Sequence, residues 1–199
     1  MDRVQHQLTL PVIVLCLVAA ACGNDGKAGR AEAAIHVDSS VAPEVELARF
    51  REGLAVPAGL TGGASSRDAL VRSFVRGLET RDSIELGDLL MSKAEFAYLY
   101  YPTHPEARAP YNLSPGLMWF MLDSHSRRGL NEAWEQRGGR PLKYVGYSCA
   151  QKLHQGKNTV WTGCMIKRRD GTGIVEEALF GPIVERGGTY KFVSYTNKL

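Results

Sequence analysis

The chain has no strong excess of charge of either sign. Its 199 residues carry 24 Lys and Arg against 21 Asp and Glu, a formal net charge of +3. The two signs are interspersed, as in the run Lys167-Arg168-Arg169-Asp170. Nucleic-acid-binding domains concentrate cations on one face, so the sequence indicates no nucleic-acid partner. With 44% apolar residues the chain can build a packed core, which excludes a disordered protein.

A long hydrophobic run is also missing. The apolar run near the N-terminus covers residues 8–18 and is broken by Thr9 and Pro11. A permanent membrane span needs about 20 apolar residues, so this run is too short to cross a bilayer comfortably. It follows the cationic Arg3 and precedes three small residues and Cys22, an arrangement typical of a secretory signal.

The sequence Ala19-Ala20-Ala21-Cys22 resembles a bacterial lipobox. That resemblance implies a signal peptide over residues 1–21, removed by cleavage before Cys22, and lipid on the new N-terminal cysteine. Several acyl chains anchor a protein stably, so the resemblance implies a cell-envelope protein that faces the periplasm. In enteric bacteria, Asp directly after the lipidated Cys favours the inner membrane. Gly23 occupies that position here, so the resemblance favours the outer membrane. The alternative is an ordinary signal cut nearby, with Cys22 as a spare thiol.

Cysteine is scarce, with four in the chain. Cys16 leaves with the signal and Cys22 takes the lipid, so Cys149 and Cys164 remain as a pair in an oxidising compartment. A hairpin centred on residues 156–157 places this pair directly opposite each other, with Cα atoms about 4.5 or 5.5 Å apart, within disulfide range. A bridge over a loop of about 15 residues stabilises the fold by about 3 kcal/mol. The alternative is two buried free thiols; nothing resembles a redox-active Cys-x-x-Cys pair.

The order of the remaining segments predicts an α+β domain. Residues 22–64 are rich in Gly, Ala, Asp and Ser and read as a flexible tether with room for a short helix at 43–54. A single domain is expected over residues 65–199. Helices come first, and β-rich segments follow at 143–153, 159–168, 173–185 and 190–197. This antiparallel sheet must curl around or lie against the helices to bury its apolar face.

Polar residues spaced three apart mark the expected helix starts. The pairs are Ser65 with Asp68, Asp82 with Glu85, and Ser92 with Glu95. A further helix is expected to begin at Ser114-Pro115, because Pro suits the first helical position. Its predicted buried face consists of Leu117, Phe120 and Met121.

The layout over residues 67–199 resembles the nuclear-transport-factor-2-like (SnoaL-like) superfamily. The resemblance rests on the polar junction Arg81-Asp82 with the segment to Leu86, a third helix and a closing curved antiparallel sheet. It implies a cone-like roll with a pocket between sheet and helices. Members include isomerases, dehydratases, epoxide hydrolases and binding or dimerisation modules, so the resemblance alone does not imply catalysis.

Motifs for nucleophilic, metal or phosphate chemistry are missing. The segment Gly146–Ala150 is similar to a nucleophile elbow but lacks the final Gly and leads into a hairpin rather than a helix. The chain has no Ser-x-x-Lys, no His-Glu-x-x-His and no phosphate loop. Its histidines, His6, His36, His104, His125 and His154, have no metal-ligand spacing. No metal and no cofactor is therefore expected.

Two acidic positions are candidates for general acid–base chemistry. Asp123 could orient His125, but only if the helix breaks at Ser124, since residues two apart on a helix point in different directions. Glu176 or its neighbour Glu177 must face inward if the third strand is regular, and burial would raise the pKa of that carboxyl. For Asp123 and His125 the alternative is a solvated helix end. For the glutamates the alternatives are an exposed strand edge and an ion pair with Arg168 across the hairpin.

Aromatic side chains are the strongest indication of a ligand site. We predict that a set of four lines or rims a pocket between helices and sheet, namely Tyr98, Tyr101, Trp119 and Trp161. The alternative is simple packing in the core.

Three functional hypotheses follow from the sequence. The first is an envelope lipoprotein, not an enzyme, that binds a small molecule or a protein partner. The second is a small isomerase, dehydratase or hydrolase that uses Asp, Glu, His or Tyr in the cone. The third is a structural module that forms a homodimer through an open sheet face.

Overall fold

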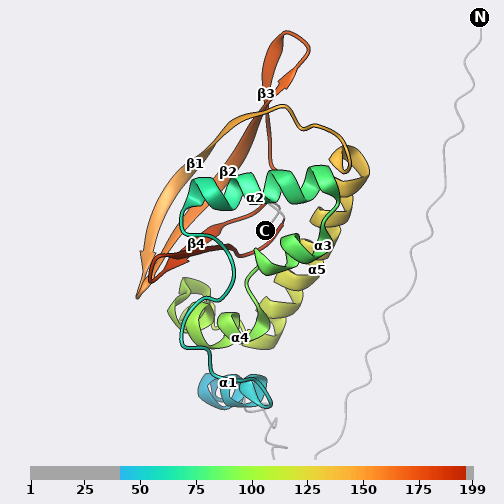
Figure 1. Ribbon diagram of the computed structural model, residues 1–199. Helices are drawn as coiled ribbons and strands as arrows, with labels where there is room; N and C mark the ends of the chain where they lie inside the picture. Colours follow the sequence, from blue (N-terminus) through green and yellow to red (C-terminus); the bar gives the residue numbers. More distant parts are fainter. Residues whose placement is uncertain (1–40, 196–199) are drawn as a thin grey trace, which may run out of the picture. The chain divides into compact units, whose positions relative to one another are not determined.

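The computed structural model describes residues 41–195. The expected signal peptide, Cys22 and the first part of the expected tether lie outside these residues. The chain forms helices followed by strands, an α+β arrangement (Figure 1). The helical part contains α1 (Pro43–Arg51), α2 (Arg67–Thr80), α3 (Ser83–Asp88), α4 (Lys93–Glu95), the π-turn η1 (Phe96–Tyr100), the 3-10 turns η2 (Tyr101–Thr103) and η3 (Pro105–Ala107), and α5 (Pro115–Arg137).

Side-chain caps fix where the helices begin. The Asp82 carboxylate accepts from the backbone N–H groups of Ile84 and Glu85 at the start of α3. Ser92 and Glu95 form a complete capping box at α4, as their spacing predicts. At α2 the cap is Ser66, which accepts from Ala69 at 3.1 Å, so the expected start at Ser65 is wrong by one residue.

The buried face of α5 differs from the predicted one. Leu117 and Phe120 are exposed, and the core side consists of Pro115, Met118, Leu122, Ser126 and Ala133. The buried stripe follows the same helical period but is displaced by one residue. The sequence pattern therefore gave the correct period with the wrong phase.

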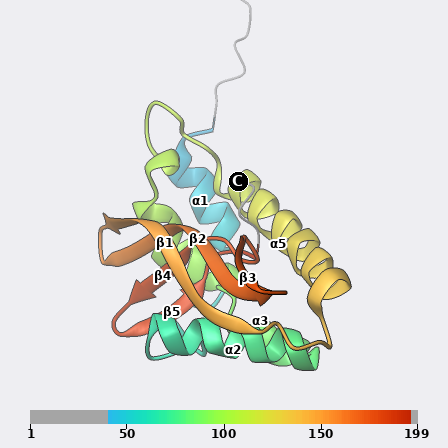
Figure 2. The same cartoon turned by 90° about the horizontal axis from the view of Figure 1, so that it is seen from above.

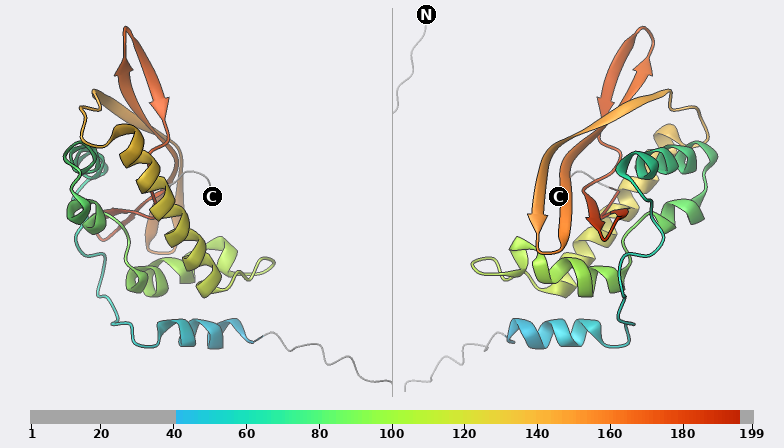
Figure 3. Two further views of the ribbon diagram at one scale, coloured as in Figure 1. Left: turned by 90° about the vertical axis from the view of Figure 1, so that its right-hand side faces the viewer. Right: turned by 60° about the vertical axis from the view of Figure 1, so that its left-hand side comes forward.

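The five strands form one antiparallel sheet that does not close on itself. The strands are β1 (Tyr144–Gln155), β2 (Asn158–Asp170), β3 (Gly173–Glu177), β4 (Ile183–Arg186) and β5 (Thr189–Phe192). Their order is β1-β2-β4-β5, and β3 pairs with the far end of β2, where the two strands project (Figures 1 and 3). The single strand expected at 173–185 is thus two strands. Pro182 lies between them and lacks the N–H that a ladder needs.

The β1–β2 hairpin has the predicted register and the predicted disulfide. Cys149 pairs with Cys164 and is bonded to it, and the two Cα atoms lie 3.9 Å apart, closer than the expected spacing. Next to this pair, Ala150 lies opposite Gly163, which has a φ of +62°. A Cβ added to Gly163 would lie 2.9 Å from the Cβ of Ala150, so only glycine fits this close approach.

Consecutive residues of the central strands point into two different cores. Three pairs of neighbouring residues, on β2, on β4 and at the end of β5, divide between two buried hydrophobic clusters. The first cluster contains Trp161, Ile183 and Phe192, and the second contains their neighbours Val160, Val184 and Val193. Side chains alternate across a sheet, so both faces are covered here. The first cluster surrounds Phe74 of α2, and the second surrounds Phe96 of η1. In Figure 2 the strands accordingly lie between α2 and the group formed by α1 and α5.

Segment 60–64, expected to belong to the tether, is part of this fold. Ala64 pairs with Tyr190 through two backbone hydrogen bonds, and Leu60 is buried in the second cluster. The backbone N–H of Thr61 donates to the Glu95 carboxylate at 2.7 Å. The folded unit therefore begins N-terminal to the expected boundary at residue 65.

Candidate functional site

A cavity of about 540 Å³ lies on the face of the sheet that carries the second cluster. Its walls come from the η1–η3 segment, α5, the β1–β2 hairpin, Pro182 and Val193. Most of the wall is apolar, including Met118, Met121, Leu122, Leu153, Val160 and Val193. The polar part consists of Tyr100, His104, Glu106, Gln155 and Thr162.

The π-turn η1 positions the aromatic side of the cavity. Its wider turn ends with Tyr100, whose ring is buried and lines the cavity. Burial raises the pKa of the Tyr100 hydroxyl, and the nearby Glu106 charge adds to this effect. Tyr100 is therefore a neutral hydroxyl at physiological pH. Turns of this kind are rare and frequently occur at functional sites.

His104 places an imidazole beside Tyr100, with 5.3 Å between the ring centroids. Its Nδ1 accepts a hydrogen bond from the Glu106 backbone N–H at 3.3 Å and so caps η3. Burial lowers the pKa of His104 and outweighs the opposing effect of the Glu106 carboxylate. The imidazole is therefore neutral at pH 7, and this acceptor role of Nδ1 leaves the proton on Nε2, which can donate.

Gln155 contributes an acceptor to the same cavity. Its Oε1 is buried and has no hydrogen-bond partner within residues 41–195. The adjacent Asn158 differs, since its amide donates to Leu99 O at 2.8 Å and its Oδ1 accepts from Arg186 at 3.1 Å. A buried acceptor without a partner costs free energy that a ligand donor can recover.

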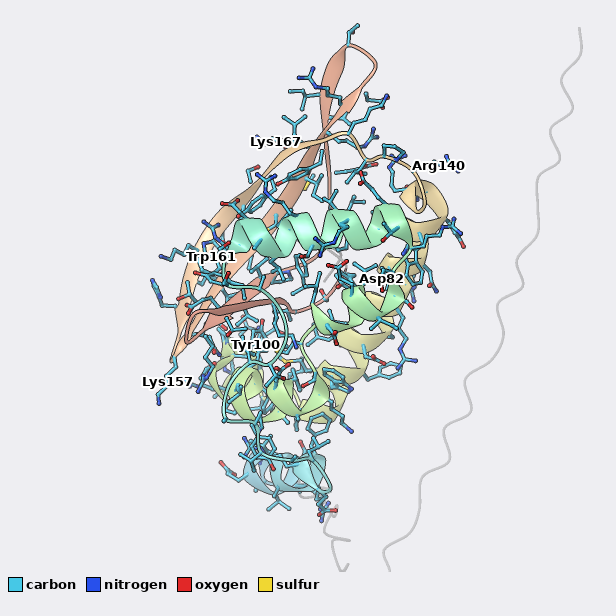
Figure 4. The ribbon with its side chains drawn as sticks, in the orientation of Figure 1. Asp82, Tyr100, Arg140, Lys157, Trp161 and Lys167 are labelled. Atoms are coloured by element: carbon cyan, nitrogen blue, oxygen red, sulfur yellow. A yellow bond between two sulfur atoms is a disulfide. The ribbon has the colours of Figure 1, made fainter. Side chains whose placement is uncertain are left out.

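The four predicted aromatics do not line this cavity. Tyr98 lies under the Arg51 guanidinium, Tyr101 donates to Leu113 O at 2.7 Å, and Trp119 packs against Phe96. Trp161 is in the other core, with the Arg67 guanidinium 4.5 Å from its ring centroid. Figure 4 shows Trp161 near the start of α2, apart from Tyr100.

Within the predicted aromatic run, the structure brings Tyr100 rather than its neighbours to the cavity. The π-turn changes the angular spacing of residues 96–100, which a period of 3.6 does not anticipate. The sequence feature that could have indicated this part of the cavity is the spacing of Tyr100 and His104, which lie four residues apart.

The acid–base candidates are likewise elsewhere. The α5 helix continues through Ser124, whose hydroxyl donates to Phe120 O at 2.6 Å, so the break that an Asp123–His125 dyad needs does not occur. Asp123 instead pairs with Arg127 at 2.7 Å. The Nδ1 of His125 is buried, with no partner among the residues that the structure describes.

The acidic pair on β3 is engaged in ion pairs. Glu176 contacts Lys167 at 3.0 Å, and Glu177 accepts from Arg168 at 2.6 Å and also binds Arg137. Partial burial raises the pKa of Glu177, but the hydrogen bonds from Arg137 and Arg168 outweigh it and leave that pKa lowered. The structure therefore contains the ion pair with Arg168 across the hairpin, which was one of the alternatives to an acid–base role for this strand.

Among the described residues, no group of three or more His, Cys, Asp or Glu side chains is placed to hold a metal ion. In the same part of the chain, no helix combines the length and the apolar character needed to span a bilayer. Comparison with protein-family models, with curated proteins and with solved structures found no match. The chain is thus defined here by its α+β fold and its largely apolar cavity.

Proposed function

We propose that this chain is a lipid-anchored envelope protein whose domain binds a small, mostly apolar molecule in the cavity beside α5. The observation that carries the binding proposal is the cavity itself: about 540 Å³, with an apolar wall and a few polar groups. Small-molecule sites commonly enclose about 300–1,000 Å³ and have this composition. The anchor rests on the lipobox at Cys22, with the outer membrane as the favoured location.

The polar groups suggest the chemistry of the ligand. Neutral Tyr100 and His104 can each donate a hydrogen bond, and Gln155 Oε1 can accept one. No cation lines the cavity among the described residues, and Glu106 is the one carboxylate there. We therefore expect an uncharged amphiphile with a hydroxyl or amide at one end, rather than an anion.

The cone-like roll of the nuclear-transport-factor-2-like superfamily remains part of this proposal. A cavity between α5 and the sheet is where that layout would place a pocket. The disulfide supports export, because such bonds persist in oxidising compartments.

Two experiments test the two halves of the proposal separately. For the anchor, radiolabelled palmitate should label the chain but not its Cys22→Ser variant, and labelling of the variant would contradict lipidation. For the cavity, N-phenyl-1-naphthylamine should gain fluorescence with the protein, and Met121→Trp should abolish the gain by filling the site. Ile84→Trp, on the exposed surface of α3, is the matched control and should bind as the original chain does. Equal probe binding by both variants would contradict the cavity site.

A small enzyme is a second candidate, and His104 is the observation that favours it. A neutral imidazole with its proton on Nε2 can donate a hydrogen bond to a ligand carbonyl and polarise it for reaction. Asp123, His125 and Glu176 do not line the cavity. His104→Gln tests this role. If the protein is an enzyme, the variant should still bind the ligand but should convert it more slowly. If the protein only binds the ligand, neither the original chain nor the variant should alter the ligand chemically.

A further inference from the structure

Five large apolar side chains are exposed at one end of the domain. Val41 and Val45, at the start of α1, expose 41% and 44% of their surface. Tyr111, Leu117 and Phe120 expose 70%, 48% and 67%. Leu117 and Phe120 are three residues apart on α5 and so share one helical face.

The segments that carry these residues lie side by side. Leu47 and Phe50 of α1 pack on the same cluster as Leu113 and Trp119, which flank the start of α5. Figures 2 and 3 show the beginning of α1, the 105–113 segment and the beginning of α5 at the same end of the molecule. We call the set Val41, Val45, Tyr111, Leu117 and Phe120 the apolar end.

The chain enters the described fold at this end. Val41 is 19 positions after Cys22 in the sequence, and an extended chain spans at most about 3.3–3.6 Å per residue. The connection can therefore reach no more than roughly 60–70 Å from the lipid. A lipid on Cys22 would hold the apolar end at high effective concentration beside the bilayer.

We propose that the apolar end docks on the lipid bilayer, so that the domain lies against the membrane instead of hanging free from its tether. The inference rests on the lipid anchor of the proposed function. Tyr and Phe suit the membrane–water interface, and apolar burial adds to the affinity that the acyl chains provide.

The charges around this end indicate which force drives docking. Helix α1 carries Glu44 and Glu46 in its first turn and Arg49 and Arg51 in its last, and the 105–113 segment carries Glu106 and Arg108. Because both signs are present, attraction to anionic headgroups is not the basis of docking. Docking should therefore persist in vesicles of zwitterionic lipid and at high salt, where electrostatic binding is screened.

The test uses the lipidated full-length chain in phosphatidylcholine vesicles that contain chain-brominated phosphatidylcholine. Bromine quenches nearby tryptophan fluorescence, and Trp119 adjoins Phe120 in the sequence. The original chain should be quenched, and Leu117→Glu with Phe120→Glu should lose most of this quenching while remaining on the vesicles. Ile84→Glu, at an apolar position on α3 that is even more exposed (78%), is the control and should be quenched like the original.

The outcomes separate docking from anchoring. If the original chain floats with the vesicles but is not quenched, or if the double variant is quenched equally, docking is refuted and the anchor stands. If the original chain does not float with the vesicles, the anchor itself fails, and docking fails with it. Quenching could also occur only at concentrations where sedimentation shows dimers. That result would mean that the apolar end binds a second copy of the chain, and it would also overturn the proposal.

Discussion

The Glu95 carboxylate and the Lys191 ammonium group lie 3.0 Å apart inside the domain, where the two residues expose 1% and 3% of their surface. Lys191 Nζ also donates to Thr61 O at 2.7 Å, and Glu95 accepts from the backbone N–H groups of Ser92 and Thr61. The pair thus joins segment 60–64, α4 and β5. A buried pair of this kind is stable only because its other polar atoms are also satisfied.

Removing one partner of this pair should be much more costly than removing both. Lys191→Met leaves a buried carboxylate without its counter-charge and should lower the free energy of unfolding by about 3–5 kcal/mol. The double variant Glu95→Gln with Lys191→Met should recover part of that loss, because neither side chain is then charged. Urea unfolding of the original chain, Lys191→Met, Glu95→Gln and the double variant measures both effects. A double variant that loses the sum of the two single losses would show that the groups are not coupled.

The same pair predicts sensitivity to acid. Burial raises the pKa of Glu95, but the hydrogen bonds from Ser92 and Thr61 and the charge of Lys191 outweigh it, so the folded pKa lies below the ordinary 4.5. The unfolded chain therefore takes up the proton first as pH falls. The contribution of Glu95 is complete above about pH 4.5 and decreases as pH falls through the folded pKa. Unfolding free energies between pH 6 and pH 3 (roughly the range where carboxylates titrate) should fall less steeply in Glu95→Gln, and an unchanged slope would contradict this role.

The disulfide should leave no free thiol in the mature domain. Thiol titration of the denatured, unreduced protein should detect neither Cys149 nor Cys164. Reduction should lower the free energy of unfolding by about 3 kcal/mol, since the bridge closes a loop of about 15 residues. Reaction of both cysteines without reductant would contradict the bond.

Two glycines with similar backbone angles should respond differently to substitution. Gly63 has a φ of +67°, and a Cβ there would lie 2.4 Å from Tyr190 O, a backbone atom. Gly53 has a φ of +74° with no atom within 4 Å of such a Cβ. Gly53→Ala should cost about 1–2 kcal/mol, the penalty for a left-handed residue. Gly63→Ala should cost clearly more, because segment 60–64 must also separate from β5. Equal thermal stability of the two variants would contradict this contact.

Much of the fold could be predicted because its signals are local. The turn at 156–157 fixes the hairpin register, and the capping pairs at Asp82 and Ser92 mark helix starts. These features depend on neighbours within a few residues. The phase of α5 could not be predicted in the same way, because Leu117 and Met118 are equally apolar and tertiary packing decides which one is buried.

The candidate site was harder to predict, because its residues are brought together by two irregular features. The π-turn places Tyr100 at the cavity instead of Tyr98 or Tyr101. The positive φ at Gly163 occurs within β2, next to Thr162 in the cavity wall. Neither irregularity has a sequence pattern as clear as a cap or a turn, so regular periodicity pointed to other aromatics.

The most direct test of cavity binding follows the methionine methyl groups by NMR. Met118 and Met121 line the cavity, whereas Met91 and Met165 do not. The measurement uses the unlipidated Cys22→Ser chain labelled at methionine methyl carbons and titrated with N-phenyl-1-naphthylamine in the absence of detergent. Binding in this cavity should give saturable shifts of the Met118 and Met121 signals, with those of Met91 and Met165 nearly unchanged. Saturable binding that leaves the Met118 and Met121 signals in place, or no binding at all, would contradict a ligand site in this cavity.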